Sequence, residues 1–259
     1  MSTEVRLARS KEELLQLFRF RYAIYVEGMG RKPRHADHSS QTIEEPLDST
    51  GYNMIALEDG QIVGALRANI GTETDFGEYG ELYEMGRAGA WFPEHVSMTS
   101  KFMVATQHRG GTVAVRLALA CFEFGCLQDI FFDFMDTNRH LEATYQRLGY
   151  HAYKGRCVHP DYGDVLPMVL SLTDEQHLMS VHSPYLRVRR RFPWAKPPVM
   201  FPNEQGHPQP NHESMNGIPS ESRAGARAGD LQSLSSRSDQ DVVSVDKVGT
   251  VNFFRLHKP

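Results

Sequence analysis

The sequence predicts a mixed α/β (α+β) fold, in which one central sheet carries helices on both of its faces. Three observations lead to this prediction. Two apolar segments flank Glu58-Asp59-Gly60-Gln61, and Asp-Gly supplies the positive φ angles that a tight hairpin requires. An apolar strand, a glycine-containing turn and an apolar helix follow one another between Ser97 and Cys126. Strands and helices then alternate to about residue 172, as is typical of a mixed sheet.

The expected elements follow in order along the chain. After a short first strand, Ser10 and Glu13 form a capping box that opens a helix ending near Val26. The hairpin supplies the next two strands, which are antiparallel. Beyond it come a strand, a helix that is apolar on nearly every face, a Phe-rich strand, a helix and two final strands. The expected strands are 4–8, 52–57, 62–69, 98–104, 129–135, 151–157 and 165–172, and the expected helices are 10–26, 112–126 and 138–148.

Length and composition are those of a soluble globular protein. The chain has 259 residues, of which 40% are apolar and 23% charged, and its net charge is −4. We therefore expect no recruitment of nucleic acid or of a membrane surface by bulk charge. No apolar run reaches the about 18 residues that a transmembrane helix requires. Three cysteines without metal-type spacing, and no apolar leader, indicate a reducing compartment, so we expect a cytoplasmic protein.

The composition changes near Phe192. Beyond this residue, a mixture of Ser, Gly, Pro, Asn and Arg with almost no apolar periodicity continues to about Gln240. Such a segment buries too little apolar surface to offset the entropy of ordering it. We therefore expect a folded domain at residues 1–190 and a largely disordered tail at 191–259. Within the tail, only Val248 to Leu256 carries a weak strand signal.

Arg21 lies on the same helical stripe as the apolar residues Leu14 and Phe18. A buried arginine requires a carboxylate partner, and the acidic segment Glu44 to Asp48 supplies candidates. Two interpretations stay open. Arg21 holds this segment over a cleft, or its side chain extends along the helix edge into solvent. The long connection from Gly28 to Gly51 favours a functional lid or a short extra helix.

The turn Gln107-His108-Arg109-Gly110-Gly111-Thr112 stands between a strand ending at Val104 and a helix. Backbone N–H groups converge at such a corner, and the positive end of the helix dipole lies behind them. Glycine lets the backbone approach a ligand closely. Because of this context we expect the corner to bind phosphate or phosphopantetheine, although a Gly-Gly pair elsewhere would be an ordinary loop feature.

Two signatures in this region, together with the order of the elements, resemble the GNAT acyltransferase superfamily. The first reads Gln/Arg-x-x-Gly-x-Gly/Ala, which Gln107 and Gly110 match, while Thr112 replaces the final small residue. The second is an Asn, a Tyr seven positions on and a Gly-aromatic pair beyond it. Its spacing is kept by Asn138, Tyr145 and Gly149-Tyr150. The resemblance covers nearly the whole expected domain and implies a GNAT-like mixed sheet that is splayed at its centre.

The resemblance also implies how a donor is held. The strand ending at Val104 would pair its backbone with the pantetheine arm of an acyl thioester. Tyr145 would protonate the departing thiolate, because the pKa of a phenol, about 10, lies close to that of a thiol; the alternative is that its ring only packs on the sheet. No general base is assigned, and Glu27, Glu84 and a water chain stay open. The implied donor-binding residues are Phe102, Met103, Val104, Gln107, Arg109, Gly110, Gly111, Thr112 and Asn138.

The N-terminal half resembles one branch of these enzymes, the acyl-homoserine-lactone synthases and the N-acyl amino acid synthases. The similarity rests on Arg21-x-x-x-Tyr25-Val26, the acidic loop ending at Asp48, Gly64-x-x-Arg67 and Ser100-Lys101-Phe102-Met103-Val104. It implies transfer of a long acyl chain from acyl carrier protein to the amine of a small molecule. The acceptor-side residues that it implies are Arg21, Tyr25, Asp48, Arg67, Ser100 and Lys101.

Two departures from the lactone synthases bear on the acceptor. Those enzymes carry Trp where this chain has Arg31, and Glu-x-Ser-Arg-Phe where it has Met98-Thr99-Ser100-Lys101-Phe102. Both argue against S-adenosylmethionine, so an amino acid acceptor fits better. The crowding of the helix N-terminus by Thr112 favours the single phosphate of a carrier-bound pantetheine over the pyrophosphate of coenzyme A. The basic segment Arg187 to Trp194 either docks an acidic carrier or is a solvated end of the domain.

The sequence therefore predicts an N-acyltransferase that takes an acyl-phosphopantetheine thioester from acyl carrier protein, or alternatively coenzyme A, and holds no permanent cofactor. The alternatives are an acetyl-coenzyme A-dependent N-acetyltransferase and a non-catalytic acyl-ligand sensor. No metal site is expected, because His35-Ala36-Asp37-His38 lacks a third ligand at a recognised spacing. Asp133 and Asp136 are interpreted as residues that end a strand and cap the next helix.

Overall fold

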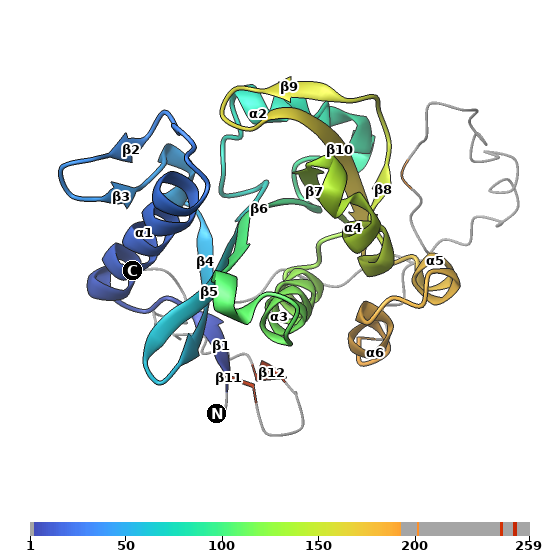
Figure 1. Ribbon diagram of the computed structural model, residues 1–259. Coiled ribbons are helices and arrows are strands. Elements are labelled where there is room, and N and C mark those ends of the chain that lie inside the picture. The colour runs from blue at the N-terminus through green and yellow to red at the C-terminus, as the bar shows by residue number, and fades with distance from the viewer. Residues whose placement is uncertain (1–2, 193–200, 202–243, 246–250, 253–259) are drawn as a thin grey trace, which may run out of the picture.

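The computed structural model describes residues 3–192, Phe201, 244–245 and 251–252 (Figure 1). The strands are β1 Glu4–Leu7, β2 Ala36–Asp37, β3 Thr42–Ile43, β4 Tyr52–Glu58, β5 Gln61–Ile70, β6 Val96–Val104, β7 Phe132–Thr137, β8 His151–Ala152, β9 Cys157–His159, β10 Gly163–Ser171, β11 Ser244–Val245 and β12 Val251–Asn252. The α-helices are α1 Lys11–Tyr22, α2 Glu78–Leu82, α3 Val113–Leu127, α4 Glu142–Leu148, α5 Glu175–Ser180 and α6 Tyr185–Arg189.

One mixed sheet organises the domain, which confirms the predicted fold class. Its strands lie in the order β1-β4-β5-β6-β7-β10-β8, and β9 pairs with β10. The pairing of β6 with β7 is parallel, and the other neighbours in the sheet are antiparallel. The sheet therefore consists of two antiparallel halves that meet at a single parallel contact.

The parallel contact between β6 and β7 is short, so the sheet is splayed at its centre. Pairing covers only Val96 to Met98 on β6 and Phe132 to Phe134 on β7. The rest of β6, Thr99 to Val104, keeps its antiparallel partners on β5 but has no register partner on β7. Its free edge therefore faces the opening between the two halves.

A β-bulge lies on β6 where the strands separate. Ser100 pairs with Arg67, and Met103 pairs with Ala65, so two residues of β6 lie opposite one residue of β5. Lys101 within the bulge has φ = 54°, in the left-handed region that non-glycine residues seldom adopt. The bulge breaks the alternation of side chains along the strand, and Ser100 and Lys101 both face the opening.

Helices cover both faces of the first half of the sheet, as predicted. Ile55 of β4 packs in the cluster beneath α1, whereas its neighbours Met54 and Ala56 pack in the cluster beneath α3. Since successive side chains of a strand point to opposite faces, α1 and α3 lie on opposite faces. Figure 1 shows them on either side of β4 and β5.

Several sequence-based bounds were wrong in detail. The predicted first helix ends as α1 at Tyr22 and continues as a π-helical turn, Ala23–Gly28. The last predicted helix begins as the 3-10 helix Arg139–Leu141, and the strand expected at 151–157 is divided into β8 and β9. The Phe-rich strand begins three residues later than expected, at Phe132. Not predicted were β2, β3, α2, α5, α6 and the 3-10 helices Met85–Trp91 and Thr106–His108. The 3-10 helix Pro46–Asp48 lies in the connection where a lid or a short extra helix was expected.

The predicted disordered tail falls largely outside the described residues. Phe201 is described, is 4% exposed and packs its ring against Phe132, Phe134 and Tyr153. The pair of β11 with β12 places a strand within 248–256, the part of the tail with a strand signal.

Candidate active site

A cavity of about 160 Å³ occupies the opening between β6 and β7. The bulged segment Thr99 to Phe102 lines one wall, and the β7 segment Met135 to Thr137 lines the other. The opening exists because β6 and β7 stop pairing after Met98. The cavity is therefore a direct consequence of the splayed sheet.

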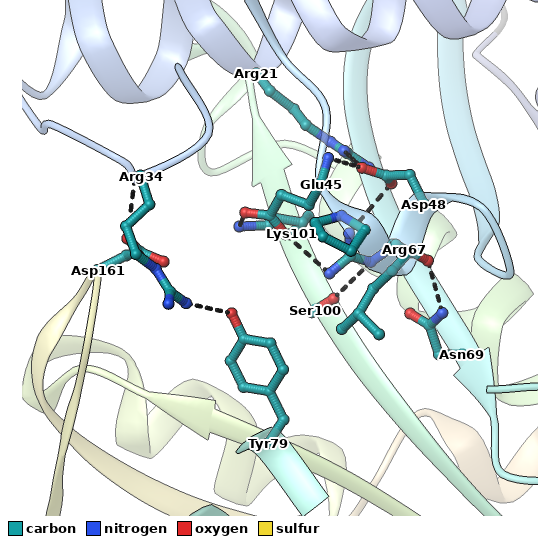
Figure 2. A network of polar contacts seen from close by, with 12 residues as sticks. Arg21, Arg34, Glu45, Asp48, Arg67, Asn69, Tyr79, Ser100, Lys101 and Asp161 are labelled. Carbon is teal, nitrogen blue, oxygen red and sulfur yellow. Dashed lines mark hydrogen bonds and ion pairs between the residues drawn. The ribbon is translucent and has the colours of Figure 1, made fainter. Parts of the chain in front are cut away.

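A chain of buried ion pairs lies behind the cavity (Figure 2). The fully buried Arg21 guanidinium contacts Asp48 Oδ2 at 2.7 Å and donates to Asn53 Oδ1 at 2.6 Å. Arg67 lies 3.2 Å from Asp48 Oδ1, so the carboxylate of Asp48 is held between two guanidinium groups. This confirms that Arg21 holds the acidic segment rather than extending into solvent. The helix α1 and the strand β5 are thereby fixed to the same loop.

The chain of ion pairs continues into the cavity through Glu45 and Lys101. Arg67 contacts Glu45 Oε2 at 3.1 Å and donates to the Ser100 hydroxyl at 3.2 Å. Lys101 Nζ contacts the other Glu45 oxygen and the Tyr162 hydroxyl. Figure 2 shows Glu45 between Lys101 and Arg67. Glu45 thus joins the loop before β4 to the bulge of β6.

The charges in this cluster determine its pKa values. Burial by itself would raise the pKa of Asp48, but Arg21 and Arg67 hold it at about 2. Burial lowers the pKa of Lys101 to about 8, with Arg67 acting in the same direction and Glu45 against it. The cluster has three cations, Arg21, Arg67 and Lys101, and two carboxylates, so Lys101 is the cation most easily neutralised.

Aromatic rings and one further guanidinium form the remaining wall of the cavity. The Tyr25 and Tyr162 rings lie with their centroids 5.7 Å apart, and His159 stacks on Tyr162 at 4.4 Å. The Arg31 guanidinium lies 5.8 Å and 5.1 Å from the Tyr25 and Tyr162 ring centroids, and it donates to Asn138 Oδ1 at 3.2 Å. This wall therefore offers cation–π surfaces and a positive charge to a ligand.

Tyr145 lines the cavity from α4 and packs edge-on against the rings of Phe102, at 6.4 Å, and Tyr150, at 5.9 Å. Burial raises the pKa of its hydroxyl, so the phenol keeps its proton throughout the neutral range. Tyr145 thus presents a protonated hydroxyl to the cavity.

A second, much smaller cavity of about 20 Å³ lies inside the core on the other side of Phe102 and Tyr145. Both cavities share Thr99, Phe102 and Tyr145 in their linings. The inner cavity is mostly apolar, and its volume is about that needed for a single water molecule. These shared side chains lie where the two cavities adjoin.

The predicted phosphate corner is exposed, as a binding site requires. Gly110 has φ = 79°, which favours glycine, and a Cβ atom there would meet no other atom within 4 Å. The Gly111 N–H donates to the His108 carbonyl at 3.3 Å, so it already has an internal partner. Thr112 is the N-cap of α3, which is 15 residues long. The first-turn N–H groups of α3 are thus the principal donors at this corner.

The structure separates the predicted site residues by their position relative to the cavity. Those that line the cavity are Tyr25, Arg67, Ser100, Lys101, Phe102, Asn138 and Tyr145. Arg21 and Asp48 lie behind the cavity and support it. Met103 is buried under α1. The strand end and the corner beyond the cavity contain Val104, Gln107, Arg109, Gly110, Gly111 and Thr112. Glu27 and Glu84, the two candidate bases, are exposed and outside the cavity lining, and Glu84 pairs with Lys154 at 2.6 Å.

Sequence reasoning assigned no site role to Arg31, Asp136, His159 and Tyr162, which also line the cavity. It interpreted Asp133 and Asp136 as residues that cap a helix, and this was wrong. Asp133 accepts hydrogen bonds from Ser97 at 2.5 Å and Tyr150 at 2.6 Å within the core. Asp136 lies within β7 and lines the cavity. Strand alternation could have indicated that Asp133 and Asp136, which are three positions apart, face opposite sides of the sheet.

A splayed sheet with a bulged strand, followed by a glycine turn at a helix N-terminus, defines an acyltransferase fold. The model of the acetyltransferase (GNAT) family matches residues 13–150. The chain therefore belongs to the GNAT family and is an acyltransferase, as its motifs predicted.

Solved structures with the same fold include members of the predicted branch. The CoA-dependent acyl-homoserine lactone synthase BjaI is 18% identical, with a TM-score of 0.54 over 70% of this chain and 91% of that chain. FeeM, an N-acyl amino acid synthase from uncultured soil microbes, is 12% identical, with a TM-score of 0.55 over 70% and 97%. The lactone synthase LasI is 18% identical, with a TM-score of 0.51 over 66% and 88%. At these identities the similarity shows the fold, and no curated protein matches the chain.

The described residues present neither a metal-ligand cluster nor a membrane-spanning helix. These residues contain no group of three or more His, Cys, Asp or Glu side chains placed to hold a metal ion. His38 from the histidine pair instead hydrogen-bonds the Tyr22 hydroxyl at 2.7 Å. No described helix has both the length and the apolar character needed to span a bilayer.

Proposed function

We propose that the protein is an N-acyltransferase that moves an acyl group, expected to be long, from an acyl carrier protein thioester to the amine of an amino acid. The observation that carries this proposal is the position of the outer cavity, between β6 and β7. It adjoins the free edge of β6 and Tyr145 on one side, and it reaches the buried charge cluster and the Arg31 wall on the other. A donor and an acceptor can therefore meet between β6 and β7.

The donor side supports a pantetheine thioester. From Thr99 onward the edge of β6 facing the opening has no β7 partner, and an extended amide-containing arm can add to such an edge. The exposed corner at Gly110 and the N-terminus of α3 follow this edge along the chain and suit a phosphate. BjaI has been solved with SAM and isopentyl-CoA, so coenzyme A is the alternative carrier to test.

The acceptor side supports a small molecule that carries a carboxylate. Arg31 contacts two tyrosine rings and one amide oxygen in the cavity, and a guanidinium has five N–H donors. A planar guanidinium binds a carboxylate with two parallel hydrogen bonds. Arg31 occupies the position where the lactone synthases carry Trp, so this contact favours an amino acid over S-adenosylmethionine.

In the reaction, the neutral amine attacks the thioester carbonyl, the C–N bond forms and the C–S bond breaks. Tyr145 gives its proton to the departing thiolate and regains one from the attacking nitrogen by way of solvent. The products are an N-acyl amino acid and the free thiol of the carrier.

The proposal is tested by incubating the protein with acyl carrier protein thioesters of different chain lengths and with acetyl-coenzyme A, each with a mixture of amino acids. Release of free thiol is followed, and the products are identified by mass spectrometry. Thiol release and N-acyl amino acid formation with carrier thioesters are expected. Turnover of acetyl-coenzyme A alone would overturn the synthase proposal.

One observation favours a second function, that of an acetyl-coenzyme A-dependent N-acetyltransferase. The inner cavity holds only about 20 Å³, and Phe102 and Tyr145 line both it and the outer cavity. A short acyl group needs no further space there, whereas a long chain must lie along the outer cavity or displace these rings. The chain-length series in the same assay distinguishes the two functions.

A further inference from the structure

The cavity has two carboxylates among its lining residues, and they differ in how their oxygens are satisfied. Both Glu45 oxygens are in ion pairs, one with Arg67 at 3.1 Å and the other with Lys101. Glu45 is therefore already neutralised by protein cations. Glu45 therefore has no unpaired oxygen with which to bind a positively charged ligand group.

Asp136 is the other carboxylate, and one of its oxygens is unsatisfied. Its Oδ2 atom is shielded from solvent and makes no hydrogen bond of standard geometry among the described residues, and the Tyr83 hydroxyl is its neighbouring donor. A buried carboxylate oxygen that lacks a well-placed donor is costly, because it has lost its hydrogen bonds to water. Asp136 lies on β7 beyond the last pairing with β6, so it lines the cavity opposite the bulge. A ligand with a positive N–H donor would satisfy this oxygen.

The charged and titratable groups around Asp136 come from several elements. They are Arg31, Tyr83, Lys101, Tyr145, Tyr153 and Cys157. Burial raises the pKa of Asp136, while the Tyr83 hydroxyl and the two cations lower it. Asp136 also contributes to raising the pKa of Tyr145. The carboxylate and the proposed general acid, Tyr145, are therefore near each other in the cavity.

We propose that Asp136 binds the ammonium group of the acceptor and removes one of its protons, which makes it the general base of the reaction. The assignment rests on the proposed function and supplies the group that it lacks. The N–H bond of the ammonium breaks, its electron pair stays on nitrogen, and the proton passes to Asp136 and then to solvent. The neutral nitrogen attacks the thioester as described above, and its second proton balances the one that Tyr145 gives to sulfur.

The alternatives fit this role less well. Lys101 is charged in its ion pair with Glu45, and a charged Lys101 repels an ammonium instead of binding it. Glu27 and Glu84 lie outside the cavity lining. Asp133 is enclosed in the core by the Ser97 and Tyr150 hydroxyls.

The test compares wild type with Asp136→Asn, which keeps the shape of the side chain, using one turned-over amino acid and hydroxylamine as acceptors. Hydroxylamine is largely unprotonated at neutral pH and needs no base. For the amino acid we expect Asp136→Asn to lower kcat/KM by about 100-fold or more and to move the acidic limb of its pH profile up to the pKa of the amino acid's own amine. For hydroxylamine we expect a change of less than about fivefold, because only the proton transfer has been removed.

The control is Glu94→Gln, which neutralises an exposed carboxylate outside the cavity lining and should match wild type with both acceptors. Asp136→Glu, whose carboxylate is displaced by one methylene, should keep the acidic limb near its wild-type pH at reduced turnover. An equal loss with both acceptors would show a structural role and overturn the assignment, as would an unchanged rate with the amino acid. If wild type turns over no amino acid at all, the proposed function itself fails.

Discussion

Lys101, in the bulge of β6, contacts the hydroxyl of Tyr162, which lies in the turn between β9 and β10. This contact connects the two halves of the splayed sheet across the cavity. The same ammonium contacts Glu45, so three segments far apart in the sequence meet at one atom. Because β6 and β7 no longer pair here, side chains provide the connection that backbone hydrogen bonds provide elsewhere in the sheet.

The first prediction concerns the pH dependence of stability. Lysine in an unfolded chain has a pKa of about 10.4, whereas burial lowers the pKa of Lys101 to about 8. Between these values the unfolded state binds the proton and the folded state does not, so the free energy of unfolding rises with pH. Below pH 8 both states are charged, and the full cost of burying the ammonium applies.

Relative to Lys101→Met, wild type should gain on the order of 3 kcal/mol from pH 7 to 11. Urea denaturation at a series of pH values measures this gain, and the exposed Lys11→Met is the control. If the free energy of unfolding had the same pH dependence in wild type and Lys101→Met, the prediction would be contradicted.

The second prediction concerns the ion pair behind the cavity. Arg21→Met leaves the buried Asp48 with one of its two guanidinium partners and leaves Asn53 without its donor. Removing one partner of a buried pair typically costs about 3 to 5 kcal/mol. We expect a loss of stability of this size in chemical denaturation. The exposed Arg19→Met on the same helix should change stability by less than about 0.5 kcal/mol. Equal effects of the two variants would show that the buried pair has no special role.

The third prediction concerns Tyr145. Tyr145→Phe removes the hydroxyl but keeps the ring that packs on Phe102 and Tyr150. If this hydroxyl protonates the thiolate, turnover should fall by about 100-fold or more while the affinity for a non-hydrolysable donor analogue is retained. Steady-state kinetics and calorimetric titration measure the two effects separately. A protein with no turnover in wild type would instead be an acyl-ligand sensor.

The fourth prediction concerns the barrier between the two cavities. Phe102→Ala removes a side chain that lines both of them, so the inner cavity should open to the outer one. We expect the preferred acyl chain to become longer, as measured by kcat/KM over a series of thioesters, with Phe102→Leu in between. An unchanged preference would mean that the acyl chain does not enter the inner cavity.

The fifth prediction concerns the donor carrier. Arg109 is exposed at the turn before α3, beside the expected phosphate corner. Arg109→Glu should lower kcat/KM for an acyl carrier protein thioester by about tenfold at low salt, and by less at high salt, because carrier proteins of this kind are acidic. A neutral acyl-N-acetylcysteamine thioester is the matched control and should be affected little. Similar losses with both donors would indicate a defect unrelated to carrier docking.

The basic segment considered for carrier docking is largely engaged within the protein. Arg190 pairs with Glu175 at 3.0 Å, Arg191 pairs with Glu123 at 3.1 Å, and Arg189 donates to the Phe192 carbonyl. Trp194 lies outside the described residues. Arg187 is exposed and remains available for docking, so its contribution to carrier recognition is expected to be smaller than that of Arg109.

Local patterns determined much of this fold in advance. The Asp59-Gly60 turn, the strand and glycine turn before α3, and the spacing from Asn138 to Tyr150 act over short stretches of chain. Backbone geometry and side-chain periodicity specify such features without reference to the rest of the protein. The mixed sheet, α1, α3 and the family were therefore predictable from the sequence.

Tertiary structure alone decided which charged groups meet at the site. Glu45, Lys101 and Tyr162 are distant in the sequence, and Asp136 had the sequence pattern of a helix cap. Their proximity depends on where β6 bulges and where it parts from β7, which long-range strand register determines. A carboxylate becomes a ligand-binding group only when its neighbours leave it buried and unpaired, and no local pattern in the sequence encodes that condition.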